Sequence, residues 1–404
     1  MISKLKHIVI ASIALVVLAL LPTSCITDVE CEGLGEGVPT LTLLVYLAGD
    51  NNLSPIGQIP ETLRQVWKYT GNRCLIYYDA PDGTPKLLSL RGGCAANPVP
   101  YIETIAEYPE ENSASASVFS RVMSDVERMY PADSYGLLFC SHGSGWLPSG
   151  ALANPMPRSV GLDKHPGTVE PGGKEMELSD FAAAIPDHHF DFIIFESCLM
   201  AGVEVAYELR NKTDYILASS AELLSPGFLK IYKNSFGDLM NTKLSIEERL
   251  KRMGQNYYSE MNAHSGSERS ATLSLIRTNK MEELAVWANE IIKNITGESD
   301  LNIHSLQHFD RPGSYGDSPV APRFFDFGEY MEHLAEPKSF AVLSGLINDI
   351  VIWKATTPYF MEGENGFQIR HYSGMTTYIQ QDIFPDLNVS WQQTAWGKVM
   401  ERRE

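Results

Sequence analysis

Basic residues are scarce in this 404-residue sequence: 32 Lys and Arg stand against 50 Asp and Glu, which gives a formal net charge of −18. A protein that binds nucleic acid needs a basic surface to neutralise phosphates, so the composition argues against nucleic acid as a partner. Internal repeats and low-complexity segments are also lacking. The hydrophobic content of 44% and the charged content of 20% indicate a globular protein with a sizeable core.

Long hydrophobic runs are lacking except near the N-terminus. Lys4 and Lys6 precede an apolar run at residues 8–21, and small residues follow up to Cys25. This run is shorter than the ~20 apolar residues of a transmembrane helix, and its layout is that of an export signal. We therefore expect residues 1–24 to be a signal peptide and the protein to be exported.

The cysteine at the expected cleavage point resembles that of a bacterial lipobox, although Pro22 and Thr23 depart from the usual Leu-Ala-Gly pattern. We expect Cys25 to carry lipid and to attach the protein to the cell envelope, at the outer membrane or the cell surface; plain secretion is the alternative. Removal of the signal would also remove two lysines and change the net charge from −18 to −20. The polar, aperiodic residues 25–38 are typical of a tether.

Cysteines are few, six in the whole chain. If Cys25 carries lipid, five remain, and an odd number in an exported protein indicates at least one free thiol. Cys74 and Cys94 flank a short excursion of the chain and could form a disulfide, which spacing alone does not decide.

Recognisable metal and serine-nucleophile motifs are lacking. The ten histidines have no zinc spacing, and neither H-E-x-x-H nor an EF-hand loop occurs. We therefore expect no metal site and no required cofactor. The "HGSG" stretch superficially resembles the oxyanion loop of lipases, but no G-x-S-x-G elbow accompanies it, which argues against a serine hydrolase.

Short apolar runs of β type alternate with helical patterns from Leu41 onward. Continuous apolar strands separated by helices are typical of a parallel sheet covered on both faces, so the sequence predicts an α/β sandwich. The carboxyl ends of such strands are the expected place for a site. Strands are expected at 41–48, 74–80, 135–140, 190–195, 214–220 and 271–276, and helices near 61–69, 114–130, 200–210 and on both sides of the last strand within 241–295.

Proline and glycine interrupt this alternation between residues 150 and 180. We expect residues 150–180 to be a long insertion without secondary structure. Such insertions are usually functional or disordered. We assign residues 39–295 to the main domain and treat residues 296–404 as a C-terminal extension packed on the same domain.

Reactive residue types follow two of the expected strands, His142 after one and Cys198 after the next. A lone cysteine at a strand end more often serves packing. If the two strands are parallel neighbours, however, imidazole and thiol meet at one edge of the sheet. A helix N-terminus and a nearby imidazolium lower the pKa of a thiol, and Cys198 lies where a helix would begin. The backbone amides of Gly143 and Cys198 are candidates for holding an oxyanion.

Three stretches, "LLVYLAGDNNLS", "YGLLFCSHGSGW" and "FDFIIFESCLMAGVEVAYEL", resemble the clostripain family of cysteine peptidases, relatives of caspases. The resemblance covers about residues 40–230. It implies a caspase-like three-layer α/β/α sandwich with a mostly parallel central sheet, a His142–Cys198 dyad and cleavage after basic residues. Some members need calcium, which is therefore a possible cofactor here. Members are often cut between the His and the Cys, here expected after Arg158, Lys164 or Lys174.

Glu196 matches the acidic pocket residue of the family, which is an aspartate, and is longer by one methylene. Side chains alternate along an extended segment, so Glu196 and Cys198 should point the same way. We expect a residual preference for basic P1 residues, with arginine over lysine. The alternative is that Glu196 caps the helix expected after Cys198. The stretch at 221–230 retains only Glu222 of the acidic residues that many members carry.

Four further residues are assigned to substrate binding: Asp50 and Asn51, which could instead cap the following helix, and Ser219 and Ser220, at the end of an expected strand. The sequence therefore predicts a cell-envelope cysteine endopeptidase acting on protein or peptide substrates. The alternative is a catalytically silent homologue that serves as a surface binding module, which the loss of acidic residues after Ser220 favours.

Overall fold

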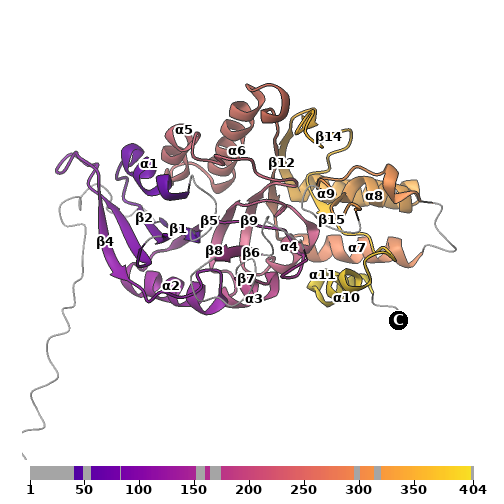
Figure 1. Cartoon of the computed structure of the whole chain (residues 1–404), viewed down its shortest axis with the longest axis horizontal. Helices are drawn as coiled ribbons and strands as arrows, with labels where there is room; N and C mark the ends of the chain where they lie inside the picture. Colours follow the sequence, from indigo (N-terminus) through magenta and orange to yellow (C-terminus); the bar gives the residue numbers. More distant parts are fainter. Residues whose placement is uncertain are drawn as a thin grey trace, which may run out of the picture.

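The centre of the molecule is a nine-stranded sheet with the strand order β12-β10-β9-β8-β5-β1-β2-β3-β4 (Figure 1). Its five middle strands are parallel neighbours, and nearly all of their residues are buried, as expected for strands covered on both faces. The five are β1 Leu41–Ala48, β2 Arg73–Asp79, β5 Ser134–Cys140, β8 Phe190–Glu196 and β9 Thr213–Ala218. The computed structural model describes residues 41–48, 56–81, 83–151, 160–163, 174–294, 301–313 and 320–401.

Antiparallel strands complete both edges of the sheet. The pair β3 (Lys86–Arg91) and β4 (Tyr101–Glu107) continues from β2, and β10 (Thr272–Arg277) followed by β12 (Val351–Thr356) continues from β9. The strand at β10 is present as predicted. Since β12 comes from the C-terminal residues, the sheet continues across the boundary expected at residue 295.

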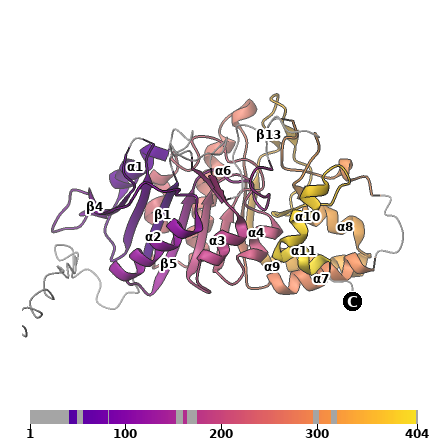
Figure 2. The ribbon, with the colours of Figure 1, turned by 60° about the horizontal axis from the view of Figure 1, so that its bottom comes forward.

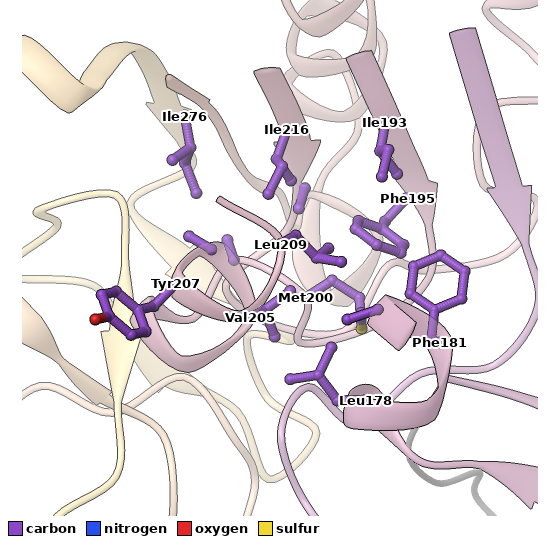
Figure 3. Packing of buried hydrophobic residues seen from close by; sticks show 14 of the residues in the cluster. Leu178, Phe181, Ile193, Phe195, Met200, Val205, Tyr207, Leu209, Ile216 and Ile276 are labelled. Atoms are coloured by element: carbon purple, nitrogen blue, oxygen red, sulfur yellow. The ribbon is translucent and has the colours of Figure 1, made fainter. Parts of the chain in front are cut away.

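Helices cover both faces of the sheet, which confirms the predicted α/β sandwich (Figures 1 and 2). Along β8 the side chains alternate: Phe192 and Ile194 face one helix layer, whereas Ile193 and Phe195 face the other. Figure 3 shows Phe195 close to Phe181 of α3. The first layer contains α1 (Ile59–Val66), α5 (Tyr232–Leu239) and α6 (Ile246–Asn262); the second contains α2 (Ala116–Met129), α3 (Leu178–Ala184), α4 (Val203–Glu208) and α7 (Met281–Lys293).

The C-terminal residues share the core of the second layer. The indole of Trp396 is 1% exposed and makes edge contacts with Tyr207 of α4 and Phe327, at centroid distances of 5.6 and 5.8 Å. The fully buried Glu204 of α4 accepts hydrogen bonds from the Tyr378 amide at 2.9 Å and the Trp391 indole at 3.0 Å. These residues join α4 to α8 (Phe327–Leu334), α10 (Pro385–Gln393) and α11 (Ala395–Met400), while α9 (Pro337–Ile350) leads into β12.

Short two-stranded antiparallel sheets lie outside the central sheet. Strand β6 (Val160–Asp163) pairs antiparallel with β7 (Lys174–Met176), and α3 begins directly afterwards. The expectation that 150–180 lacks secondary structure is therefore wrong for these residues, because a pairing across the segment is not visible in local composition. Arg158 and Lys164 lie outside the described residues. The other pairs are β11 (Phe325–Asp326) with β15 (Thr376–Thr377), and β13 (Tyr359–Phe360) with β14 (Phe367–Gln368).

The cysteines pair differently from the expectation. Cys94 is disulfide-bonded, whereas Cys74 is a free thiol, so the disulfide that the sequence left open between these two is not formed. The side chain of Cys74 is fully buried between the sheet and α1, and this burial raises the pKa of its thiol. The partner of Cys94 lies outside the described residues, as does Cys25.

A helix of the length and apolar character needed to span a bilayer is absent from the described part of the chain.

If the extension and the main domain share one core, Trp396→Ala should destabilise the whole molecule. Loss of a buried indole leaves a cavity and typically costs about 3–5 kcal/mol. Denaturant unfolding followed by near- and far-UV circular dichroism should show one transition moved to a lower midpoint. Val389→Ala, at a residue of α10 that is 58% exposed, serves as the control and should leave the midpoint nearly unchanged. Two separate transitions, with only one shifted, would contradict a shared core.

Candidate active site

The register between β5 and β8 brings the two reactive residues to one edge of the sheet. Cys140 pairs with Glu196 across these parallel neighbours. His142 and Cys198 each follow this pair by two residues, and both line a pocket of about 60 Å³. His142 is 4% exposed and Cys198 is partly exposed. The imidazole and the thiol therefore lie at the carboxyl ends of the strands, as expected for a site in an open α/β sheet.

Two serine hydroxyls join the loops that carry these residues. Ser197 Oγ donates to the carbonyl oxygen of Ser141 at 2.9 Å, and Ser141 Oγ donates to that of Ala48 at 3.3 Å. Both bonds are buried, where a satisfied hydrogen bond is costly to lose. The loops after β5 and β8 and the last residue of β1 are thus held together at this edge of the sheet. Sequence reasoning missed both serines, although each directly precedes a reactive residue.

The backbone turns sharply after Cys198. Leu199 has a φ of +62°, a left-handed conformation that side-chain-bearing residues rarely adopt. Its amide donates to the Ala221 carbonyl at 2.9 Å. A Cβ on Gly143 would lie 2.8 Å from the Cys198 carbonyl oxygen, so only glycine allows this close approach of the two loops. Gly143 therefore lies beside Cys198; its oxyanion role stays a prediction.

The thiol of Cys198 is neutral in this structure. Its Sγ accepts a hydrogen bond from the Leu223 amide at 3.3 Å. Burial, reinforced by the nearby Glu222 carboxylate, raises the pKa of Cys198 to about 12, although the Leu223 amide and Arg311 act in the opposite direction. The expectation that a helix begins at the cysteine is wrong: α4 begins only at Val203, too far away for its N-terminus to favour the thiolate.

Glu196 lines the same pocket but is held by α5 and the turn before it. Its Oε1 accepts from the Phe228 amide at 2.6 Å, and its Oε2 accepts from the hydroxyl of Tyr232. The alternative of a cap on the helix after Cys198 is therefore wrong, because the alternation along β8 directs this side chain to the other helix layer. Burial raises the pKa of Glu196 to about 7, so its protonated and ionised forms coexist near neutral pH.

Ser219 and Ser220, also predicted to bind substrate, are not among the residues that line this pocket. Ser219 and Ser220 are 1% and 0% exposed, and Ser219 Oγ shares a hydrogen bond of 2.9 Å with Thr272 of β10. Because both side chains are buried and neither lines the pocket, their assignment to substrate binding is not supported by this structure. Asp50 and Asn51 lie outside the described residues. Other residues that line the pocket include Ile56, Ile59, Cys140, Ser141, Leu223, Ser225, Pro226 and Gly227.

A larger cavity of about 840 Å³ lies between α7, α8, α10 and α11. Its lining contains neither a thiol nor an imidazole, so we place the chemistry at the smaller pocket. Within the described ranges, no group of three or more His, Cys, Asp or Glu side chains is placed to hold a metal ion. A calcium requirement stays a prediction.

Comparison with known proteins relates this chain to one family of cysteine peptidases. The sequence profile of the clostripain family, Peptidase C11, matches residues 45–378. Among curated proteins, clostripain from Hathewaya histolytica is 23% identical over 351 residues, which are 74% of this chain and 64% of that protein. The chain thus matches less than two thirds of the length of this relative.

Two solved structures are similar over nearly the whole chain. An inactive zymogen C11 protease from Parabacteroides distasonis aligns with a TM-score of 0.75 at 26% identity, covering 91% of this chain and 99% of that one. A secreted C11 cysteine protease from Bacteroides thetaiotaomicron, in complex with an irreversible peptide inhibitor, aligns with a TM-score of 0.74 at 26% identity, covering 90% and 99%. These similarities confirm the expected fold.

Proposed function

The chain belongs to the clostripain family, and we propose that it is a cysteine endopeptidase in which Cys198 is the nucleophile and His142 the general base. The observation that supports this most strongly is that both residues line one pocket, each two residues beyond the Cys140–Glu196 pair. Nucleophile and base must lie within reach of each other for such chemistry.

The reaction follows from the chemistry of these groups. His142 takes the proton of the Cys198 thiol, and the sulfur attacks the scissile carbonyl carbon. The amides of Gly143 and Cys198 stabilise the oxyanion that forms. His142 then gives the proton to the leaving amine, and water hydrolyses the thioester. Because the resting thiol is neutral, its deprotonation accompanies the attack.

The substrates are proteins or peptides, in keeping with the peptide inhibitor bound to the protease from B. thetaiotaomicron. Glu196 gives the pocket a residual preference for basic P1 residues, arginine over lysine. A carboxylate has about four lone-pair positions; the Phe228 amide, the Tyr232 hydroxyl and the Cys140 side chain take up three of them in Glu196. An ionised Glu196 therefore keeps acceptor capacity for a guanidinium group.

The protein is exported and held at the cell envelope through lipid on Cys25. The N-terminal sequence supports this proposal, and one structural relative is described as secreted. Activation involves a cut between residues 150 and 180, after Arg158, Lys164 or Lys174. Another relative is described as an inactive zymogen, which supports an activation step.

A catalytically silent binding module is the second candidate. The raised pKa of Cys198, which burial and the nearby Glu222 carboxylate cause, favours it, since a raised pKa disfavours a reactive thiolate. Labelling of Cys198 by an irreversible thiol-directed peptide inhibitor separates the two, because only a working site accelerates that reaction over free thiol.

Cys198→Ala should abolish peptide hydrolysis, and His142→Ala should reduce kcat/KM by at least ~10³-fold, since the two groups act as a unit. For the same reason the double variant should be no less active than the worse single variant. Kinetics on a fluorogenic peptide and thermal melts of all three proteins check this. Melting temperatures close to that of the wild type serve as the folding control. Turnover retained in Cys198→Ala would exclude the mechanism.

If processing is autocatalytic, the wild-type protein should be found as two associated fragments divided between residues 150 and 180, and Cys198→Ala as one chain. Intact-mass measurement on freshly purified protein decides this. Adding active wild type to the Cys198→Ala protein tests cleavage between molecules. A single uncut chain in both preparations would show that activation does not require this cut.

The preference for basic P1 residues should depend on pH. Below pH 7 the carboxyl of Glu196 is mostly neutral, and above it mostly ionised, so the ratio of kcat/KM for P1 arginine over P1 methionine should rise from pH 6 to pH 8. A charge-assisted contact of about 1.5–3 kcal/mol corresponds to roughly tenfold to a hundredfold at full ionisation. Ionisation of the thiol affects both substrates and cancels in the ratio. Glu196→Gln should give a flat ratio; a rise that persists in this variant would show that another group is responsible.

A further inference from the structure

A buried ion pair lies beside the thiol of Cys198. Glu222, which is 4% exposed, directly precedes Leu223, whose amide donates to the sulfur. Arg311 Nε donates to Glu222 Oε2 at 2.7 Å, and the Arg311 side chain is 14% exposed. Arg311 Nη1 also donates to the Glu364 carbonyl at 3.3 Å. The pair thus brings one negative and one positive charge to the surroundings of the nucleophile.

Arg311 comes from the C-terminal part of the chain and is fixed by packing. Two residues before it, the fully buried Phe309 packs with Ala221 and Phe360 in a small hydrophobic cluster. The Phe309 amide donates to the Phe324 carbonyl at 2.8 Å. The segment carrying Arg311 therefore lies against the segment carrying Glu222, and the guanidinium has little freedom to leave.

The two charges act on the thiol in opposite directions. A buried carboxylate next to a thiol opposes loss of the proton, since the thiolate would be a second negative charge. The Glu222 carboxylate accordingly raises the pKa of Cys198 and the Arg311 guanidinium lowers it. Without Arg311, Glu222 would be a buried charge without its ion-pair partner. The other titratable groups of the described residues that face this site are Cys140 at the end of β5, His142 from the loop after it, Glu196 at the end of β8 and Tyr257 from α6.

We propose that Arg311 is a positioning residue for the thiol: by neutralising Glu222 it permits Cys198 to lose its proton during attack. This inference rests on the proposed role of Cys198 as nucleophile. It also makes the C-terminal residues part of the reactive site, since the guanidinium is supplied by residues beyond 295.

The test is the pH dependence of the alkylation of Cys198 by iodoacetamide in the full-length protein, followed by peptide mapping, which separates Cys198 from Cys74 and Cys140. Arg311→Gln should raise the midpoint of reactivity by about one pH unit or more, which is roughly a tenfold lower rate at a fixed pH below it. Glu222→Gln should lower the midpoint. In the Glu222→Gln background, Arg311→Gln should shift the midpoint of reactivity less, because the carboxylate that Arg311 neutralises is absent.

Arg210 offers a matched control. Its Nε donates to the Glu282 carboxylate and its Nη1 to the Tyr207 carbonyl, both at 2.6 Å, which reproduces the bonding of Arg311 away from the pocket. Arg210→Gln should leave the midpoint unchanged.

Arg311→Lys keeps the positive charge, so its midpoint of reactivity should lie close to that of the wild type. If Arg311→Gln does not fold, the two single variants Arg311→Lys and Glu222→Gln are compared with the wild type instead.

An unchanged midpoint in Arg311→Gln, with only a lower melting temperature, would overturn the inference and leave Arg311 a structural role. Alkylation needs no turnover. If the wild-type protein hydrolyses no peptide, the proposed function fails while the midpoints still report on the ion pair. If the wild type hydrolyses peptides and the midpoints coincide, only the inference on Arg311 fails.

Discussion

The parallel pairing of β5 with β8 is the constraint on which the site depends. Both strands are buried on both faces, so their register is fixed by packing as well as by the hydrogen-bond ladder. A slip of one residue would reverse the direction of every side chain of β8, and Glu196 would turn away from the pocket. The hydroxyls of Ser141 and Ser197 extend this constraint past the last ladder pair, to the residues that carry the imidazole and the thiol.

Two buried acidic side chains lie near the thiol of Cys198, Glu196 in the pocket and Glu222 next to Leu223, and each is stabilised by a different partner. Glu196 is held by the Phe228 amide and the Tyr232 hydroxyl, both uncharged groups, so the cost of burial appears as a raised pKa. Glu222 is held by the guanidinium of Arg311. The raised pKa of Glu196 lets its charge change near neutral pH, whereas the pairing of Glu222 with Arg311 sets opposite charges side by side near the thiol.

The C-terminal residues belong to the same structural unit as His142 and Cys198. They supply β12 to the central sheet, hydrogen-bond donors to Oε1 of Glu204, and Arg311 beside the thiol. The core residues of both parts form one cluster, in which Trp396 contacts Tyr207. A division of the chain at residue 295 would therefore cut through shared packing and through the electrostatics of the site.

The sequence by itself determined the central strands, the helices between them and the arrival of His142 and Cys198 at one edge, because continuous apolar runs and helical periodicity are local signals. The tertiary structure decided the antiparallel edges, the partners of Cys94 and Glu196, the burial of Ser219 and Ser220, and the late start of α4. It also brought Arg311 to Glu222, across 89 positions of the chain. These features depend on contacts between residues far apart in sequence. The free energy of each contact depends on how deeply its groups are buried, and burial is known only once the helix layers have packed on the sheet.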